Sequence, residues 1–220
     1  MTAVIFDLDG TLIDSAPAIH AVSNAVLTGM GFPALDMPTV RSFVGKGVPN
    51  LVRQLLIASG EDPDGPLFAR VETALVARYE TDVEGNVPYP GVPEALDALT
   101  ASGCRLAVCT NKPFRPAEAA LRHVGLLDRF GVLIGGDSLP TRKPDPAMLY
   151  RTHELLGGGP MIYVGDSEID AETAANARVP FALYTEGYRK TPVAELPHHA
   201  AFSDFAELPG IIARLRAQAA

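Results

Sequence analysis

The sequence has few cysteines, no long apolar run and no leader-like start, and each of these absences disfavours a class of protein. It contains only two cysteines in 220 residues, Cys104 and Cys109, which lie on one predicted strand. Five residues of extended chain span roughly 16 Å, beyond disulfide reach, so we expect two buried free thiols. No apolar run approaches the ~20 residues of a membrane span, and the chain enters its first strand without a basic or cleavable leader. These absences predict a cytoplasmic protein that does not contact a membrane.

Positive charge is also scarce. Lysine and arginine total 18 against 26 acidic residues, which gives a net charge of -8 and a pI near 5.1. Such a surface repels the phosphate backbone, so nucleic acid is excluded as a partner. Hydrophobic residues make up 47% of the chain, enough for a sizeable core. The length suits one large α/β domain, or a core that carries a smaller insert.

A short apolar run near the start is followed at once by two carboxylates. Residues 4–6 are typical of a buried strand, and Asp7, Asp9, Gly10 and Thr11 follow. Residues i and i+2 of an extended chain point to the same side, so the two carboxylates would repel without a cation or a shared proton. Mg²⁺ suits such oxygen ligands. Gly10 lets backbone amides approach an anion, and Thr11 can donate a hydroxyl to it. The alternative is an acidic strand end with an ordinary turn.

The next segment has helical periodicity only. A cap at Asp14 or Ser15 opens a first helix that ends near residues 29–31, and apolar spacing predicts further helices over 39–44, 49–59 and 67–79. Turn residues concentrate over 84–91. We therefore expect an all-helical domain over residues 14–85, inserted into a discontinuous core of residues 1–13 and 86–220.

From residue 92 onward, predicted helices and strands alternate. The helices cover 92–102, 116–123, 146–156, 168–177 and about 208–217, and the strands cover 105–110, 132–134, 161–164 and 181–184. Repeated units of this kind with continuous apolar strands predict a parallel sheet covered on both faces. The predicted fold class is therefore α/β, a Rossmann-like parallel-sheet core with an inserted all-helical domain. Ligands of such sheets bind at the carboxyl ends of the strands.

Polar side chains follow three later predicted strands: Thr110, Asn111 and Lys112 after 105–110, Lys143 beyond 132–134, and Asp166, Ser167 and Asp170 after 161–164. Each has an ordinary alternative, since Thr110 and Asp166 could cap a turn or a helix and Lys143 could be solvated. Because parallel strands end at one edge of a sheet, acids, hydroxyl and lysine should meet there. This joint convergence favours a functional site.

The residues expected at this edge resemble the motifs of the haloacid dehalogenase-like hydrolase superfamily. Its four motifs are matched by Asp7-x-Asp9-x-Thr11, Thr110, Lys143 and Gly165-Asp166-x-x-x-Asp170, and the resemblance covers essentially the whole chain. Within the superfamily, the strings at 14–17, 44–47, 89–92 and 134–137 are similar to those of bacterial phosphoglycolate phosphatases. The resemblance implies a Mg²⁺-dependent phosphomonoester hydrolase that converts 2-phosphoglycolate to glycolate and phosphate through an aspartyl-phosphate. Either a monomer or a homodimer fits it.

The resemblance also implies a role for each motif residue. Asp7 would be the nucleophile, Asp9 the general acid and base, and Lys143 a charge-balancing group. Mg²⁺ would be held by Asp7, by Asp9 through its backbone carbonyl, and by Asp166. The phosphate would be bound by Thr110, Asn111, Gly10 and Thr11. Asp170 and Ser167 would position Lys143 or a metal-bound water.

Three other functions remain open on the sequence. They are a phosphatase of another small sugar or acid phosphate, a phosphomutase similar to β-phosphoglucomutase, and a non-catalytic binding protein. Asp9 disfavours dehalogenation, because a halide leaving group needs no proton. His20 could serve a mutase, but its place on an amphipathic helix favours a plain surface histidine. The full set of acids, hydroxyl and lysine disfavours a mere binder.

The inserted domain would have to recognise the rest of the substrate. A carboxylate would need a cation there, and Arg41, Lys46 and Arg53 are the candidates. Lys46 lies between Gly45 and Gly47, which permit backbone angles that aim its side chain at one place. A solvated lysine in a turn is the alternative. His198 and His199 are expected to lie in a solvated loop.

Overall fold

The computed structural model describes residues 1–218, in which six strands form one sheet in the order β5-β4-β1-β6-β7-β8. The strands are β1 (Ala3–Phe6), β4 (Arg105–Cys109), β5 (Val132–Ile134), β6 (Met161–Gly165), β7 (Phe181–Tyr184) and β8 (Ala200–Phe202). All neighbouring pairs are parallel. The predicted α/β fold with a parallel sheet is confirmed. The sequence pattern does not predict β8, because two of its three residues are alanine, which is depleted in strands.

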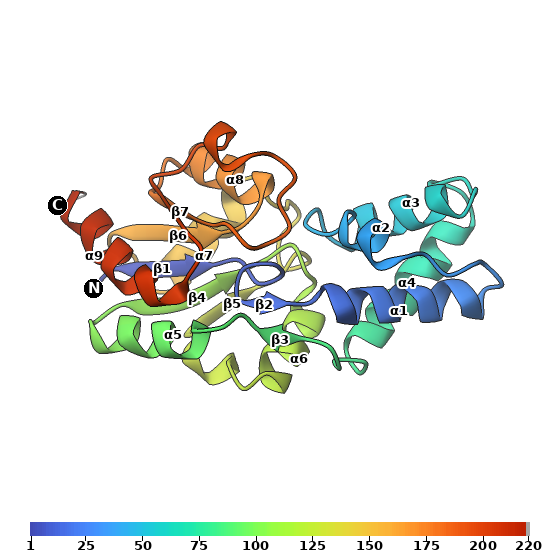
Figure 1. Cartoon of the computed structure of the whole chain (residues 1–220), viewed down its shortest axis with the longest axis horizontal. Coiled ribbons are helices and arrows are strands. Elements are labelled where there is room, and N and C mark those ends of the chain that lie inside the picture. The colour runs from blue at the N-terminus through green and yellow to red at the C-terminus, as the bar shows by residue number, and fades with distance from the viewer. Residues whose placement is uncertain (219–220) are drawn as a thin grey trace.

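Helices cover both faces of the sheet (Figure 1). They are α5 (Val92–Ala101), α6 (Phe114–His123), α7 (Ala147–Leu155), α8 (Glu168–Ala177) and α9 (Leu208–Gln218). In β1, Val4 and Phe6 belong to the hydrophobic cluster that includes α5, α6 and α9, and Ala3 and Ile5 to the one that includes α7 and α8. All four residues of β1 are fully buried. The central strand is therefore fixed from both sides, which holds the residues after it in place.

A group of helices with a hydrophobic core of its own separates β1 from β4. It consists of α1 (Ala16–Gly29), α2 (Met37–Arg41), α3 (Val48–Ala58) and α4 (Leu67–Tyr79). This helical insert extends beyond the end of the sheet at which β1 finishes (Figure 1). Two short strands, β2 (Ile13–Asp14) and β3 (Val87–Pro88), pair antiparallel where the chain enters and leaves it. The sequence does not predict this pair, because each strand has two residues and one contains proline.

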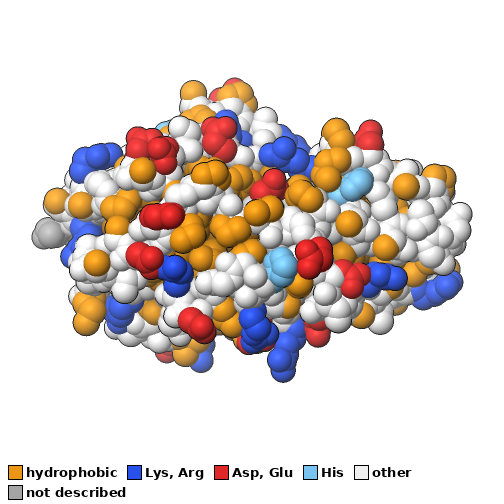
Figure 2. All heavy atoms as spheres, turned by 60° about the horizontal axis from the view of Figure 1, so that its bottom comes forward, with side chains coloured by type: hydrophobic (Ala, Val, Ile, Leu, Met, Phe, Trp, Pro, Cys, Tyr) orange, Lys and Arg blue, Asp and Glu red, His pale blue; other side chains and the backbone are white. Residues whose placement is uncertain are grey.

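The remaining elements are three 3₁₀-helices, η1 (Leu127–Arg129), η2 (Val193–Glu195) and η3 (Phe205–Glu207). Cys104 and Cys109 are free and buried, as predicted. Within residues 1–218, no helix combines the length and apolar character needed to cross a membrane. Acidic and basic side chains are interspersed with apolar ones over the face in Figure 2, in keeping with the modest negative net charge.

Candidate active site

The strand ends that carry acids and a hydroxyl meet at one edge of the sheet. In the parallel register, Phe6 lies beside Val108 of β4 and Val164 of β6. Asp7 therefore leaves the sheet close to Thr110 and Asp166. Their side chains are almost completely withdrawn from solvent. The convergence expected from the sequence is thus a feature of the fold.

Lys143 holds two of the carboxylates together. Its Nζ lies 2.9 Å from Asp7 Oδ1 and 2.7 Å from Asp170 Oδ1, and it donates to the Tyr163 hydroxyl at 2.9 Å. Tyr163 in turn donates to Asp170 Oδ1 at 2.7 Å. Burial alone would lower the pKa of Lys143, but Asp170 and Asp7 raise it above its ordinary range. Lys143 is therefore a permanent ammonium.

Asp170 is fully engaged by its neighbours. Burial would raise its pKa, but Lys143 and the hydrogen bonds from Ser167 and Tyr163 hold that pKa below its usual range. Its Oδ2 accepts from the Ser167 hydroxyl at 2.7 Å, and Ser167 accepts from the Asp170 N–H, so the pair caps helix α8. Asp170 thus supports Lys143 and fixes the turn that carries Asp166.

Asp7 and Asp166 fit a divalent cation. Oxygens of Asp7, Asp166 and Asp170 lie within 4.8 Å of one another, and all three residues are buried. Burial, reinforced by Asp170, raises the pKa of Asp7 to about 7 and that of Asp166 well above its ordinary value. Asp7 Oδ1, beyond its ion pair with Lys143, has no hydrogen-bond partner in the part of the chain that the structure describes. Crowded, buried carboxylate oxygens of this kind suit a hard cation such as Mg²⁺.

Thr11 and Gly10, the predicted phosphate ligands that follow Asp9, both lie against Asp166. The Thr11 hydroxyl donates to Asp166 Oδ1 at 2.7 Å, and the backbone N–H of Tyr188 donates to Asp166 Oδ2 at 2.6 Å. Gly10 has φ +86°, and a β-carbon there would lie 2.5 Å from Asp166 Oδ2. Gly10 therefore leaves space for the Asp166 carboxylate, and Thr11 orients it. The Thr11 hydroxyl donates to Asp166 because an ionised carboxylate accepts a stronger hydrogen bond than a neutral group does.

Asp9 is paired with a lysine that the sequence analysis left without a role. Asp9 Oδ1 lies 3.0 Å from Lys112 Nζ, and both side chains are nearly buried. Asp9 and Asp7 line the same cavity of about 40 Å³, but each carboxylate has its own ammonium. The expected repulsion is thus relieved by two lysines. The position of Lys112 directly after β4 was the signal that could have identified it.

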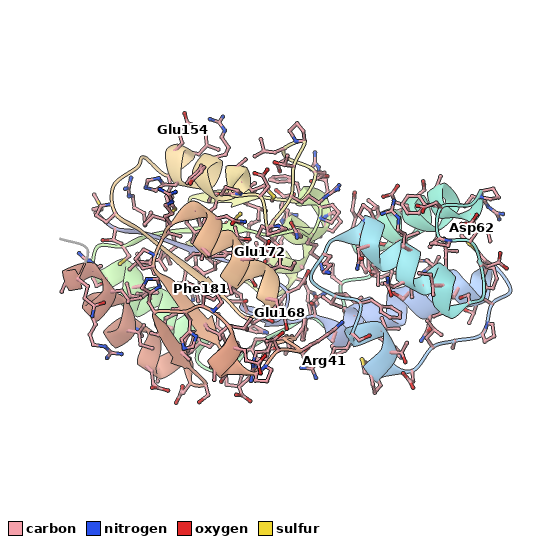
Figure 3. All side chains as sticks on the ribbon, turned by 90° about the horizontal axis from the view of Figure 1, so that it is seen from above. Arg41, Asp62, Glu154, Glu168, Glu172 and Phe181 are labelled. Carbon is pink, nitrogen blue, oxygen red and sulfur yellow. The ribbon has the colours of Figure 1, made fainter. Side chains whose placement is uncertain are left out.

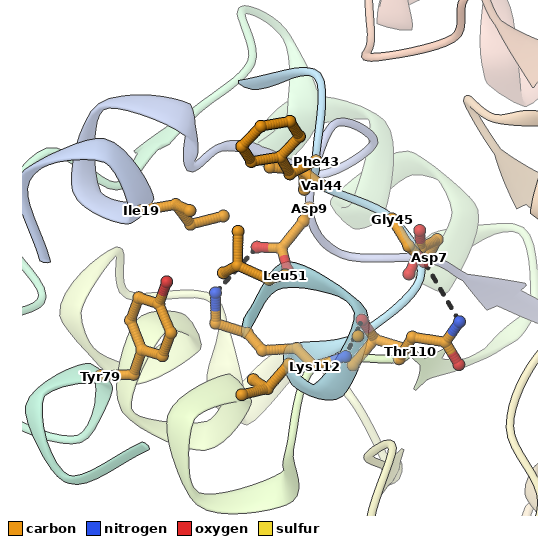
Figure 4. A pocket seen from close by; sticks show the side chains of 13 residues that line it. Asp7, Asp9, Ile19, Phe43, Val44, Gly45, Leu51, Tyr79, Thr110 and Lys112 are labelled. Atoms are coloured by element: carbon orange, nitrogen blue, oxygen red, sulfur yellow. Dashed lines mark hydrogen bonds and ion pairs between the residues drawn. The ribbon is translucent and has the colours of Figure 1, made fainter. Parts of the chain in front are cut away.

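Apolar side chains of the insert line this cavity: Ile19, Phe43, Val44, Val48 and Leu51. Figure 4 shows Ile19, Phe43, Val44 and Leu51 around the Asp9 carboxylate. Thr110 lines it from the sheet, and its hydroxyl oxygen accepts from the Lys112 N–H at 3.2 Å. That hydrogen bond leaves the hydroxyl hydrogen of Thr110 available to a ligand.

The side chain of Asn111, whose backbone amide is a predicted phosphate ligand, is occupied by the protein. Its Nδ2 donates to the carbonyls of Gly45 and Lys143, both at 3.1 Å, and its Oδ1 accepts from the Lys143 N–H at 3.0 Å. Asn111 therefore joins the 45–47 loop of the insert to the lysine of the core. Only its backbone N–H can serve an anion in the way the sequence suggested.

The three cationic candidates of the insert have different surroundings. Lys46 is exposed and lines an outer cleft of about 320 Å³ together with Asp9, Asp166 and Glu168. Arg53 pairs with Asp64 at 2.8 Å within the insert. Arg41 lies at the junction of insert and core in Figure 3, where it donates to the Gly187 carbonyl at 3.1 Å. Arg41 and Arg53 therefore have protein partners, whereas Lys46 faces the cleft.

Tyr188 is a second residue that periodicity did not reveal. Its hydroxyl accepts from the N–H groups of Ser15 and Ala16 at the start of α1 and donates to Asp14 Oδ1 at 2.7 Å. The Arg41 guanidinium lies 5.0 Å from its ring centre. Tyr188 thus connects Asp166 to the entry of the helical insert, and its place after β7 was the available signal.

The histidines make structural contacts. His20 is half-buried and its Nε2 lies 2.9 Å from the Leu35 carbonyl oxygen, so it joins α1 to the following loop. His198 Nδ1 lies 2.8 Å from the Leu196 carbonyl oxygen, and His199 Nδ1 accepts from the Phe181 N–H at 3.1 Å. The expected surface histidine at position 20 is therefore partly enclosed.

Comparisons with known proteins agree with this arrangement. The model of the haloacid dehalogenase-like hydrolase family matches residues 1–178. A phosphoglycolate phosphatase of Rhodobacter capsulatus is 60% identical, with 96% of each chain covered, and one of Cereibacter sphaeroides is 47% identical, with 99% of this chain and 100% of the relative covered. The crystal structure of a predicted phosphoglycolate phosphatase from Haemophilus somnus has a TM-score of 0.88 at 30% identity and covers 96% of this chain and 97% of its own. The chain therefore belongs to the haloacid dehalogenase-like hydrolase family.

Proposed function

We propose that this protein is a Mg²⁺-dependent phosphomonoester hydrolase whose substrate is 2-phosphoglycolate. The observation that carries the reaction type is the buried cluster of Asp7, Lys143, Asp166 and Asp170, with Asp9 and Thr110 on the adjoining cavity. The substrate follows from the relatives, which are named phosphoglycolate phosphatases at up to 60% identity over almost the whole chain.

Asp7 is the nucleophile in this proposal. A carboxylate oxygen attacks phosphorus, the new bond joins Asp7 to the phosphoryl group, and the bond from phosphorus to the glycolate oxygen breaks. The reaction requires ionised Asp7, and burial opposes ionisation. The Lys143 ammonium at 2.9 Å counters that effect, and Asp170 keeps the ammonium in place.

Mg²⁺ would be held by Asp7, Asp166 and the backbone carbonyl of Asp9. Bound there, it would offset the repulsion between the carboxylates and the dianionic phosphate. Thr11 and the Tyr188 N–H fix both oxygens of Asp166, so this ligand is oriented before any ion arrives. Ser167 and Asp170 hold the turn behind it.

Asp9 acts as the general acid and base. It lines the cavity beside Asp7, where it can protonate the departing glycolate oxygen. It then accepts a proton from the water that attacks the aspartyl-phosphate at phosphorus. That attack breaks the bond between phosphorus and Asp7, regenerates the carboxylate and releases inorganic phosphate. The Thr110 hydroxyl and the Asn111 backbone N–H donate to phosphate oxygens, on which charge is spread in the transition state.

Residues 14–85 form a cap domain in this proposal. Their separate hydrophobic core and the two-residue β2–β3 pair suit a unit that moves as a body about a narrow connection. Closure would exclude water from the aspartyl-phosphate and bring Ile19, Phe43 and Leu51 over the leaving group. A cavity of about 40 Å³ suits a leaving group of a few heavy atoms.

A substrate panel tests the proposal. Phosphate release from 2-phosphoglycolate, hexose phosphates and pyrophosphate would be compared in Mg²⁺ and after chelation with EDTA. We expect Mg²⁺-dependent turnover with the highest kcat/KM on 2-phosphoglycolate. Preference for another small phosphate would correct the substrate alone. Isomerisation of β-glucose 1-phosphate without phosphate release would identify a mutase, and no turnover of any compound would leave a binding protein.

A further inference from the structure

We propose that Lys112 and Tyr79 form the subsite that recognises the substrate carboxylate, so that the enzyme selects phosphomonoesters whose leaving group is an anionic 2-hydroxy acid. This inference rests on the proposed function and assigns the end of the substrate that the phosphate ligands do not reach. It differs from the expectation that a cation of the 45–47 loop performs this task.

The available donors distinguish Lys112 from the other buried lysine. An ammonium has three N–H donors. Those of Lys143 face Asp7, Asp170 and the Tyr163 hydroxyl, so no donor remains for a second anion. The Lys112 ammonium donates to Asp9 Oδ1 at 3.0 Å. Its other two donors have no partner among the residues that the structure describes, and Lys112 lines the cavity.

Tyr79 supplies a second unused donor beside it. This tyrosine ends α4 and is only 6% exposed. The buried Ser23 hydroxyl is the neighbour of its hydroxyl, yet neither hydroxyl has a partner at hydrogen-bond distance within residues 1–218. Lys112 Nζ lies 5.4 Å from the centre of its ring. Figure 4 shows the Tyr79 hydroxyl and the Lys112 ammonium on the same side of the cavity, below Ile19 and beside Leu51. A buried hydroxyl and a buried ammonium without full sets of partners are costly unless a ligand satisfies them.

The position of this pair matches the shape of the substrate. Asp9 must reach the oxygen that joins phosphorus to the leaving group, because it protonates that oxygen. In a phosphorylated 2-hydroxy acid the carboxylate is one carbon away from the same oxygen. A group in contact with Asp9 is therefore within reach of the carboxylate, and Lys112 is such a group. The phosphate end stays with Thr110 and Asp7 on the sheet side of the cavity.

The surroundings make the contact selective. Ile19, Phe43 and Leu51 exclude water from this end of the cavity, which strengthens a charge-assisted hydrogen bond. A neutral leaving group would leave the Tyr79 hydroxyl and two ammonium donors unsatisfied. Lys46, by contrast, is exposed on the outer cleft, where solvent and salt screen its attraction for an anion.

The test compares 2-phosphoglycolate with its neutral amide, which keeps the shape and removes the charge. The ratio of the two kcat/KM values would be measured for the full-length enzyme, for Lys112→Met, for Tyr79→Phe and for Lys46→Met. We expect Lys112→Met to lower this ratio roughly 10- to 100-fold, the worth of one charge-assisted hydrogen bond, and Tyr79→Phe to lower it about 2- to 10-fold. Lys46→Met should change it less than either.

Two results would overturn the proposal. Equal losses on both substrates in Lys112→Met would mean that Lys112 acts only by positioning Asp9. A larger drop in the ratio for Lys46→Met would assign the carboxylate to the loop. Should Lys112→Met have no turnover, binding of 3-phosphonopropionate and of its amide by calorimetry decides in the same way. A native enzyme that hydrolyses other phosphomonoesters but shows no preference for the carboxylate refutes only this inference, whereas one without phosphatase activity refutes the proposed function.

Discussion

At the scale of the residue, each acid of the site is held by a different set of partners. Asp7 pairs with Lys143, Asp9 with Lys112, and Asp166 takes hydrogen bonds from Thr11 and the Tyr188 backbone. These partners suit the roles that we propose. A nucleophile must stay ionised, an acid–base group must exchange protons with the substrate, and a metal ligand must keep its orientation.

The first prediction concerns Asp7. Asp7→Asn should reduce turnover by several powers of ten, because the substitution removes the attacking oxygen and a metal ligand together. The fold should survive, since an amide of the same shape fills the position. Asp62→Asn, the same change at the exposed far end of the insert, is the matched control and should leave kcat within twofold (Figure 3). Residual activity of Asp7→Asn within tenfold of the native enzyme would exclude a nucleophile at this position.

The second prediction separates Asp9 from Asp7. Asp9→Asn keeps the backbone carbonyl and removes the acid and base, so turnover of 2-phosphoglycolate should fall by about 10²- to 10⁴-fold. The affinity for Mg²⁺, measured by calorimetry, should change little. With p-nitrophenyl phosphate, whose leaving group needs no proton, Asp9→Asn should slow the first step less than it does with 2-phosphoglycolate. A parallel collapse of Mg²⁺ affinity would show that the Asp9 side chain itself serves the metal.

At the scale of the element, the regular parts of the chain follow from its sequence. Helix α4 and strands β5 and β7 have the bounds that apolar spacing predicts. Periodicity fails for the β2–β3 pair, whose strands are too short to have a period, and for β8, in which two of three residues are alanine. It also cannot show partners: Thr11 and Gly10 were assigned to phosphate because they follow Asp9, yet the fold brings Asp166 to them from 155 residues away.

The third prediction concerns the close contact between Gly10 and Asp166. Gly10→Ala should lower Mg²⁺ affinity at least tenfold and reduce turnover to the same extent. The new methyl group would lie 2.5 Å from Asp166 Oδ2 and would push that carboxylate out of position. Gly60→Ala is the matched control. Gly60 has φ +80° but nothing within 4 Å, so it carries the backbone strain alone. It should cost about 1 kcal/mol of stability and leave Mg²⁺ affinity unchanged. Equal effects of the two variants on Mg²⁺ binding would mean that strain, and not the contact with Asp166, is responsible.

At the scale of the whole molecule, the proposed metal ligands are carboxylates that folding buries. The sheet edge buries Asp7 and Asp166, which raises their pKa values and makes their charged forms unfavourable without a cation. The parallel sheet and its edge could be predicted from the sequence. The burial could not, because it depends on helices of the insert and on the loop after β7, which close over the edge from distant parts of the chain.

The last prediction follows from this coupling. The pKa of Asp7 is raised from 3.8 to about 7 in the fold, so without metal this group favours the folded state most when it is protonated, below about pH 3.8. That contribution is lost as the pH rises towards 7, and Asp166 acts in the same direction. Mg²⁺ requires the ionised forms, so its binding competes with protons.

The rise in Tm on adding Mg²⁺ should therefore be small at pH 5.5 and several times larger at pH 8. The apparent Mg²⁺ affinity should fall about tenfold for each pH unit below 7, for every proton displaced. Differential scanning fluorimetry at fixed ionic strength, with Asp166→Asn as the variant that lacks one ligand, measures both effects. An equal Mg²⁺ shift at the two pH values would mean that Asp7 and Asp166 are already ionised in the metal-free protein. The burial of their carboxylates would then be offset by Lys143 and by the backbone groups that point at them.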